Sequence, residues 1–208
     1  MIERLLGIVT FRPAAYREVA QDREATRIAL LIVLVVGLVR GLVGALIRAQ
    51  SGSTALLPEG YGIPEGYRME LAAGTDPTLV LVGRVVVGML FELIFWSASS
   101  RMLTLAARRF FGAQTTRANV LRIVGHTYLF HLLGAIPVPI VGQLLGSILQ
   151  IIGNVIGIRE DGKISTGKAV AAVLLSILLT ILLIVLISVI ISVIITVIVI
   201  AVISSGNR

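Results

Sequence analysis

The chain has 208 residues, of which 57% are hydrophobic and only 14% are charged, and its mean hydropathy is +1.01. Soluble proteins average about 25% charged residues, so this composition excludes an ordinary soluble domain and indicates an integral membrane protein. The absence of cysteine excludes disulfides, thiolate chemistry and cysteine-based metal sites. The net charge is +7, and the basic residues lie next to apolar segments. Orientation in a bilayer explains this arrangement better than nucleic-acid binding, so no nucleic-acid partner is expected.

The first part of the chain, residues 1–27, is a charged segment with two stretches of helical pattern. Pro13 can open a short helix that carries Tyr16 and Val19 on one side. We expect the segment to be amphipathic and to lie at the cytoplasmic membrane interface; a solvated tail is the alternative. An earlier set of apolar residues at helical spacing supports the first interpretation: Ile2, Leu5, Leu6 and Val9.

Five apolar stretches follow, each long enough for a transmembrane helix of about 20 residues. They are residues 28–47, 79–107, 118–136, 140–158 and 169–203. Residues 28–208 therefore predict an all-α membrane domain, a bundle of five transmembrane helices. The last stretch would measure about 52 Å as a straight helix, against about 30 Å of hydrocarbon. It contains neither Gly nor Pro, so we favour one long, tilted or protruding helix over two spans joined by a hairpin.

Two connections between these spans contain turn-forming residues. The loop 50–78 has a doubled Pro-Glu-Gly-Tyr unit, at 58–61 and 64–67. Its tyrosines are typical of a loop anchored at the membrane interface, with partner binding as the alternative. Pro137-Val138-Pro139 allows only a tight reversal between the third and fourth spans.

Basic residues gather at one set of span ends, which predicts the orientation. Such residues are retained in the cytoplasm, so the N-terminus is predicted to be cytoplasmic and the C-terminus outside, in the plasma or inner membrane of the cell. The residues are Arg4, Arg12, Arg17, Arg23 and Arg27 before the first span; Arg101, Arg108, Arg109, Arg117 and Arg122 around the second connection; and Arg159, Lys163 and Lys168 before the last span.

Apart from the basic residues at span ends and two histidines, three ionisable residues are embedded in the apolar spans, namely Arg40, Arg84 and Glu92. A charge there costs roughly 2.5–3.5 kcal/mol, so these residues need partners or a function. Arg84 and Glu92 would lie about 80° apart and two turns apart on one helix, too far to pair, and Glu92 is predicted to meet an arginine on another helix. The two interpretations are an interhelical tie and a polar path in a permease or channel-like component.

The connection 157–168 approaches the phosphate-binding P-loop pattern twice. Ile164 and Ala169 stand where a Ser or Thr must hold Mg²⁺, and a membrane helix precedes the loop instead of a strand. We therefore expect no nucleotide partner. Ser165 or Thr166 is predicted to cap the last helix.

No pattern indicates an enzyme, a cofactor or a metal. His126 and His131 would lie about 140° apart around a helix, so they cannot face one ion together. Metal binding requires convergent ligands of the right type, and no carboxylate lies in the same span. We expect no metal site, no cofactor and no catalytic activity.

Glycines at four-residue spacing predict close helix packing. Three such pairs let helix backbones approach, which supports a compact bundle. The spacing is equally compatible with contacts within the chain, with self-association and with assembly with other membrane proteins. The pairs are Gly37 with Gly41, Gly142 with Gly146, and Gly153 with Gly157.

Several short motifs in the second half of the chain occur in a recognisable order. They are Val-Leu-Arg-Ile-Val-Gly at 120–125, followed by Tyr128; Gly-Ala-Ile-Pro at 134–137; Gly-Ile-Arg-Glu at 157–160; and Ile-Ser-Thr-Gly-Lys-Ala at 164–169. In this order they resemble the third, fourth and fifth spans of the Yip1-domain family of polytopic membrane proteins. The short tail and small loops resemble a prokaryotic-type member.

The resemblance implies a five-span protein with a cytoplasmic N-terminus and a cytoplasmic loop motif. Eukaryotic relatives are similar to vesicle-trafficking adaptors that contact small GTPases and form hetero-oligomers. A GTPase role is not expected here, because it involves cytoplasmic regions that this chain barely has. We expect a membrane-organising or trafficking-type scaffold, with the permease as the alternative. The loop motif comprises Gly157, Arg159, Glu160, Ser165, Thr166, Gly167 and Lys168.

Overall fold

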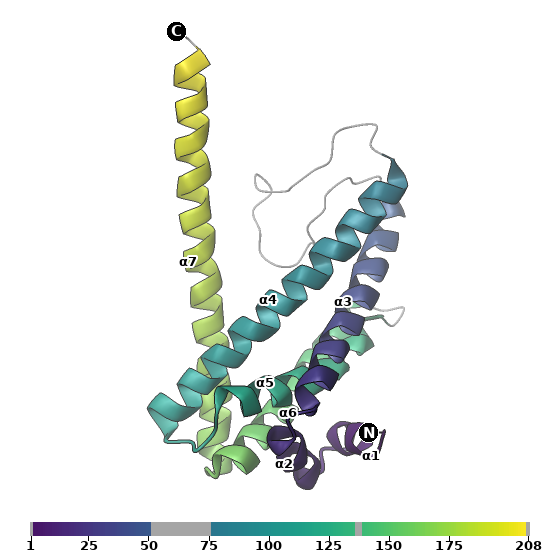
Figure 1. Ribbon diagram of the computed structural model, residues 1–208, viewed down its shortest axis with the longest axis vertical. Coiled ribbons are helices and arrows are strands. Elements are labelled where there is room, and N and C mark those ends of the chain that lie inside the picture. The colour runs from purple at the N-terminus through teal and green to yellow at the C-terminus, as the bar shows by residue number, and fades with distance from the viewer. Residues whose placement is uncertain (1, 51–75, 136–138, 207–208) are drawn as a thin grey trace.

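The computed structural model describes residues 2–50, 76–135 and 139–206, and within these ranges every regular element is helical (Figure 1). The predicted all-α fold is confirmed. The Pro-Glu-Gly-Tyr repeat and the Pro137-Val138 reversal lie outside the described residues. The helices are α1 (Ile2–Val9), α2 (Pro13–Gln21), α3 (Ala25–Gln50), α4 (Pro77–Phe111), α5 (Arg117–Thr127), the 3₁₀ helix η2 (Tyr128–Ala135), α6 (Pro139–Gly162) and α7 (Thr166–Gly206).

Local sequence sets several helix ends. The Asp76 side chain accepts a hydrogen bond from the Thr78 backbone N–H at the start of α4, and a left-handed Gly112 (φ 67°) ends that helix. Thr116 caps α5 in the same way. The predicted cap of α7 is Ser165, whose hydroxyl oxygen accepts from the Lys168 N–H at 3.4 Å.

Four of the described helices, α3, α4, α6 and α7, are long and apolar enough to cross a membrane. They correspond to the first, second, fourth and fifth predicted spans. The third span, predicted over 118–136, is not one continuous α-helix and must be corrected. It consists of the 11-residue α5 followed directly by the 8-residue η2. The α-helical part carries the polar side chains Arg122, His126 and Thr127, which are buried within the protein, whereas the 3₁₀ part is mostly apolar.

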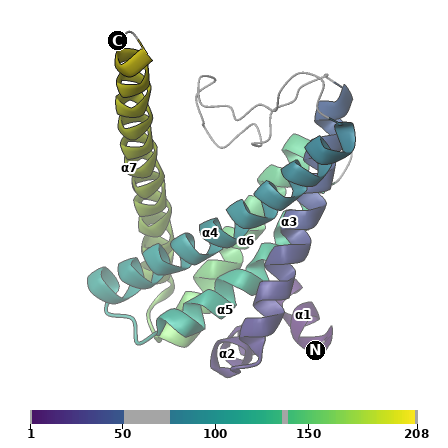
Figure 2. The same cartoon turned by 45° about the horizontal axis from the view of Figure 1, so that its top comes forward.

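The path of the chain nevertheless requires a passage through α5 and η2. Helices α4 and α6 both descend towards the end of the molecule where α1 and α2 lie, so the chain must return between them (Figure 1). The two chain termini accordingly lie at opposite ends (Figure 2).

The last helix, α7, is a single element of 41 residues, which confirms the prediction of one long helix over a hairpin. Its first half contacts α4 and α6. Towards its C-terminal end it diverges from α4, as both views show (Figures 1 and 2). Consecutive side chains such as Val185 and Leu186 are 53% and 56% exposed there, so this part of the helix presents apolar surface on several sides.

The N-terminal helices pack against the bundle. Helix α2 contacts α5 and α6, and α1 contacts α2 and α5. Ile8, Tyr16 and Val19 are fully buried, together with Ile123 of α5. The predicted short helices are therefore present, and they form a small second core below the spans.

Candidate functional site

Four glycines of α6 form a seam along α5 and η2. A Cβ added to any of them would lie 2.0–2.7 Å from an atom of the facing segment, far inside ordinary contact. The facing residue numbers fall as the α6 numbers rise, so the two segments run antiparallel. Only glycine permits this approach of the two segments. The contacts are Gly142 with Leu133, Gly146 with Phe130, Gly153 with Thr127, and Gly157 with Ile123.

The remaining glycine pair joins α3 to α4. A Cβ on Gly37 would lie 3.0 Å from Met89 Cα, and one on Gly41 would lie 3.0 Å from Val85 Cα. The structure thus places all six predicted packing glycines in contacts within one chain. Their spacing alone did not tell whether such contacts form within the chain or between chains.

Tyr16 of α2 lies across the lower end of the glycine seam. Cβ atoms on Gly153 and Gly157 would lie 3.0 Å from its hydroxyl oxygen and 3.2 Å from its Cδ1 atom, respectively. The hydroxyl donates to the Ile8 carbonyl of α1 at 3.1 Å, and burial of the ring raises the pKa of Tyr16. The motif glycine Gly157 therefore makes room for the side chain that holds both N-terminal helices on α6.

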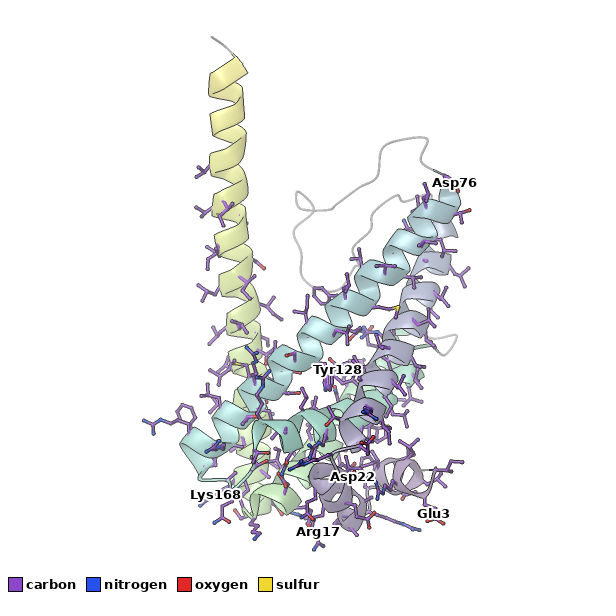
Figure 3. All side chains as sticks on the ribbon, viewed as in Figure 1. Glu3, Arg17, Asp22, Asp76, Tyr128 and Lys168 are labelled. Carbon is purple, nitrogen blue, oxygen red and sulfur yellow. The ribbon has the colours of Figure 1, made fainter. Side chains whose placement is uncertain are left out.

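Glu160, the acid of the Gly-Ile-Arg-Glu motif, makes a second link between α2 and α6. Its Oε2 atom lies 3.0 Å from Arg17 Nε, and its Oε1 atom accepts from Arg159 at 2.7 Å. The Glu160 side chain is 17% exposed, whereas Arg17 lies at the surface at the same end of the molecule as Lys168 (Figure 3). Both charged residues of the motif are thus engaged in an internal network.

Asp161 was missed by the sequence analysis. It accepts hydrogen bonds from the Thr115 hydroxyl and, at 2.9 Å, from Asn119 Nδ2. One residue further on, the Gly162 carbonyl accepts from the Gln114 N–H at 3.0 Å. These bonds fasten the α4–α5 connection to the end of α6. Two features of the sequence could have indicated this contact. Asp161 directly follows the Gly-Ile-Arg-Glu motif, and the polar run Thr-Thr-Arg-Ala-Asn, residues 115–119, stands at the start of the predicted third span.

Arg122, which lies in the Val-Leu-Arg-Ile-Val-Gly motif, joins α5 to the junction of α2 and α3. Its Nε donates to Thr26 Oγ1 at 2.8 Å and one terminal nitrogen donates to the Ala20 carbonyl at 2.6 Å. The residue is 8% exposed. Nearby, Arg4 of α1 pairs with Asp22 at the end of α2, and this hydrogen bond holds the pKa of Asp22 below its usual range.

The second half of the loop motif faces outward. Ser165, Thr166, Gly167 and Lys168 are all exposed, and a Cβ on Gly167 would meet no atom within 4 Å. The family-like motif is thus divided between residues that hold the fold, from Gly157 to Asp161, and residues that form a free surface, from Ser165 to Lys168.

Within the spans, Arg40 of α3 and Glu92 of α4 form an ion pair with an N–O distance of 2.5 Å. The prediction that Glu92 meets an arginine on another helix is confirmed. The Glu92 and Arg40 side chains are 5% and 24% exposed, respectively. Arg84 is also buried on α4, at 5% exposure.

Among the described residues no group of three His, Asp or Glu side chains is placed to hold a metal ion. His126 Nδ1 lies 2.8 Å from the Arg122 carbonyl oxygen of its own helix. His131 packs edge-on against Tyr128, with ring centroids 5.1 Å apart. The two histidines thus contact different residues, His126 the Arg122 carbonyl and His131 the Tyr128 ring.

The helices, their lipid-facing apolar surface and the buried polar ties define a multi-pass helical membrane protein. The model of the Yip1 domain matches residues 6–190, which is most of the chain. The chain belongs to the Yip1-domain family. No curated protein and no solved structure matches it.

Proposed function

We propose that this protein is a non-enzymatic scaffold or adaptor that organises other membrane proteins through the exposed surface Ser165–Lys168. The observation that carries the proposal is the division of the motif. In its first half Glu160 pairs with Arg17 of α2 and accepts from its neighbour Arg159, whereas the second half is exposed, with an unobstructed backbone at Gly167. Exposed polar residues where a connection meets the first turn of a rigid helix are well placed to bind a partner.

The orientation follows from charge. The N-terminal helices, the α4–α5 connection and the α6–α7 connection lie at one end of the molecule, and the three basic clusters belong to these segments (Figure 3). The positive-inside rule favours a cytoplasmic location for this end, in the plasma or inner membrane. The surface Ser165–Lys168 would then be open to cytoplasmic parts of a partner.

The partner would be another integral membrane protein or a second copy of the chain. Support comes from α7, whose exposed apolar side chains between Val185 and Val197 extend well beyond its contacts with α4 and α6. A partner could therefore be held both by the cytoplasmic surface and by contact within the bilayer.

The Arg40–Glu92 pair supports a scaffold over a permease. The two charges neutralise each other between α3 and α4, and the Glu92 side chain is almost fully enclosed. A polar path needs such groups to face water or substrate. Glu92→Gln in liposomes separates the two functions: loss of flux in a folded variant would support the permease and refute the scaffold.

Photo-crosslinking tests the proposed surface directly. A benzophenone amino acid placed at Gly167 in native membranes should give an adduct of defined mass, whereas the same probe at the exposed Arg23 should not. Lys168→Glu should abolish the adduct, while the matched change Lys163→Glu in the same loop should leave it. Absence of an adduct at Gly167, or equal loss in both charge variants, would contradict the proposal.

A further inference from the structure

A cavity of about 300 Å³ lies between α4, α6, η2 and the first half of α7. Its size is at the lower end of small-molecule sites, which run from about 300 to 1,000 Å³. Apolar residues form most of the wall, and no Asp, Glu, Lys or Arg lines it. Seven neutral polar residues line it from four elements: Ser99, His131, Ser147, Gln150, Asn154, Ser176 and Thr180.

The hydrogen bonds already made by these groups define what the cavity offers a ligand. The hydroxyls of Ser176 and Thr180 each donate to a carbonyl of their own helix at 2.7 Å, so their oxygens keep acceptor capacity. Asn154 Oδ1 accepts from the Thr127 hydroxyl at 2.8 Å, which leaves the amide N–H groups of Asn154 as donors. Gln150 supplies a second side-chain amide. The cavity thus presents uncharged donors and acceptors side by side.

The position of the cavity limits how a ligand can reach it. Ser176 lies ten residues after the start of α7, about 15 Å along the helix, which is a depth within the hydrocarbon core. Helices α4 and α7 diverge towards the C-terminal end of α7 (Figure 2), and the lining residue Ile184 is followed along the chain by exposed apolar residues. A ligand with acyl chains can therefore enter sideways from the bilayer and leave its chains between the two helices.

We propose that this cavity binds a neutral lipid of the diacylglycerol type, with ester carbonyls and a free hydroxyl. The carbonyls would accept from the amides of Asn154 and Gln150, and the hydroxyl would donate to the oxygen of Ser176 or Thr180. An anionic phospholipid fits less well, because no basic side chain lines the cavity to neutralise a phosphate. The scaffold function does not depend on this site.

The test uses the full chain in phosphatidylcholine nanodiscs with a trace of diacylglycerol that carries a diazirine on one acyl chain. Labelling should concentrate on α4 and α7 peptides around the cavity. Gln150→Leu should reduce it about fivefold, in the range expected for one lost hydrogen bond. Ser176→Leu, which fills the cavity, should reduce it at least as much. Gln143→Leu, on the exposed face of the same helix, should leave it unchanged.

Two results would overturn the proposal. The first is labelling that neither Gln150→Leu nor Ser176→Leu reduces. The second is equal labelling of the same peptides by a matched phosphatidylglycerol probe, because that result would indicate ordinary boundary lipid. Thermal unfolding of each variant shows whether it is folded. If Gln150→Leu is not, the near-isosteric Thr180→Val takes its place, with the same expected decrease. Adduct formation at Gly167 should persist in all of these variants, so failure here is distinguishable from failure of the scaffold proposal.

Discussion

Replacement of Gly157 by alanine tests the glycine seam at the point where it also supports the N-terminal helices. The new Cβ would lie 2.3 Å from Ile123 Cγ2, whereas ordinary contact begins at 3.4 Å, so one of the two segments must retreat by about 1.1 Å. Ile123 cannot turn away easily, because it is fully buried and a β-branched residue has one strongly preferred rotamer in a helix. Overpacking of this kind costs about 1–3 kcal/mol, against a gain of about 1 kcal/mol in helix propensity.

We therefore expect Gly157→Ala to lower the free energy of unfolding in detergent by about 0–2 kcal/mol, and by about 1–3 kcal/mol relative to a site where only the propensity gain acts. The control is Gly167→Ala, where nothing lies within 4 Å and the propensity gain should appear undiminished. In the Gly157→Ala background, Ile123→Leu removes the clashing Cγ2 at nearly constant volume and should restore part of the loss, as a double-mutant cycle would measure. A Gly157→Ala variant as stable as Gly167→Ala, or a cycle without coupling, would refute the reasoning.

Three further predictions concern the polar ties. Glu92→Gln removes the buried carboxylate that pairs with Arg40 inside the span and should destabilise the bundle by about 3–5 kcal/mol, which denaturant titration of wild type and variant would show. Tyr16→Phe removes the hydrogen bond to the α1 backbone, about 1 kcal/mol, and should speed proteolysis of the N-terminal helices without changing that of the α6–α7 loop. The hydrogen bond from Arg4 lowers the pKa of Asp22, so the stability that this bond contributes is fully present above the usual Asp pKa and is lost as pH falls through the lowered folded value. Proteolysis of the N-terminal helices should therefore rise in acid, and Asp22→Asn should abolish that rise.

Apolar length and residue chemistry were sufficient to predict most of the fold. A long apolar stretch without Gly or Pro, residues 169–203, predicted α7 as one helix, because the membrane obliges each segment to satisfy its own backbone. The cost of an unpaired charge predicted a partner for Glu92, and Arg40 is that partner. These predictions succeed because the constraint acts on each segment by itself.

The third span and the motif network depend on neighbours that no local pattern reveals. Residues 118–136 have the length of a span, but hydropathy does not tell whether Arg122 and His126 face lipid or the interior of the protein. The fit of Tyr16 over Gly153 and Gly157 joins residues more than a hundred positions apart. Asp161 was missed for the same reason, since its partners lie on α5 and on the connection before it.

Cysteine accessibility in this naturally cysteine-free chain tests the central claim most directly, namely that the polar residues of the spans are internal ties whereas Ser165–Lys168 is a free surface. Single cysteines would be placed at Glu92 and Lys168, and at Leu90 as a lipid-facing control, and treated in membranes with a membrane-impermeant thiol reagent from each side. We expect rapid labelling at Lys168 from the cytoplasmic side only, and none at Glu92 or Leu90. Labelling at Glu92 from either side, or protection at Lys168, would contradict the account.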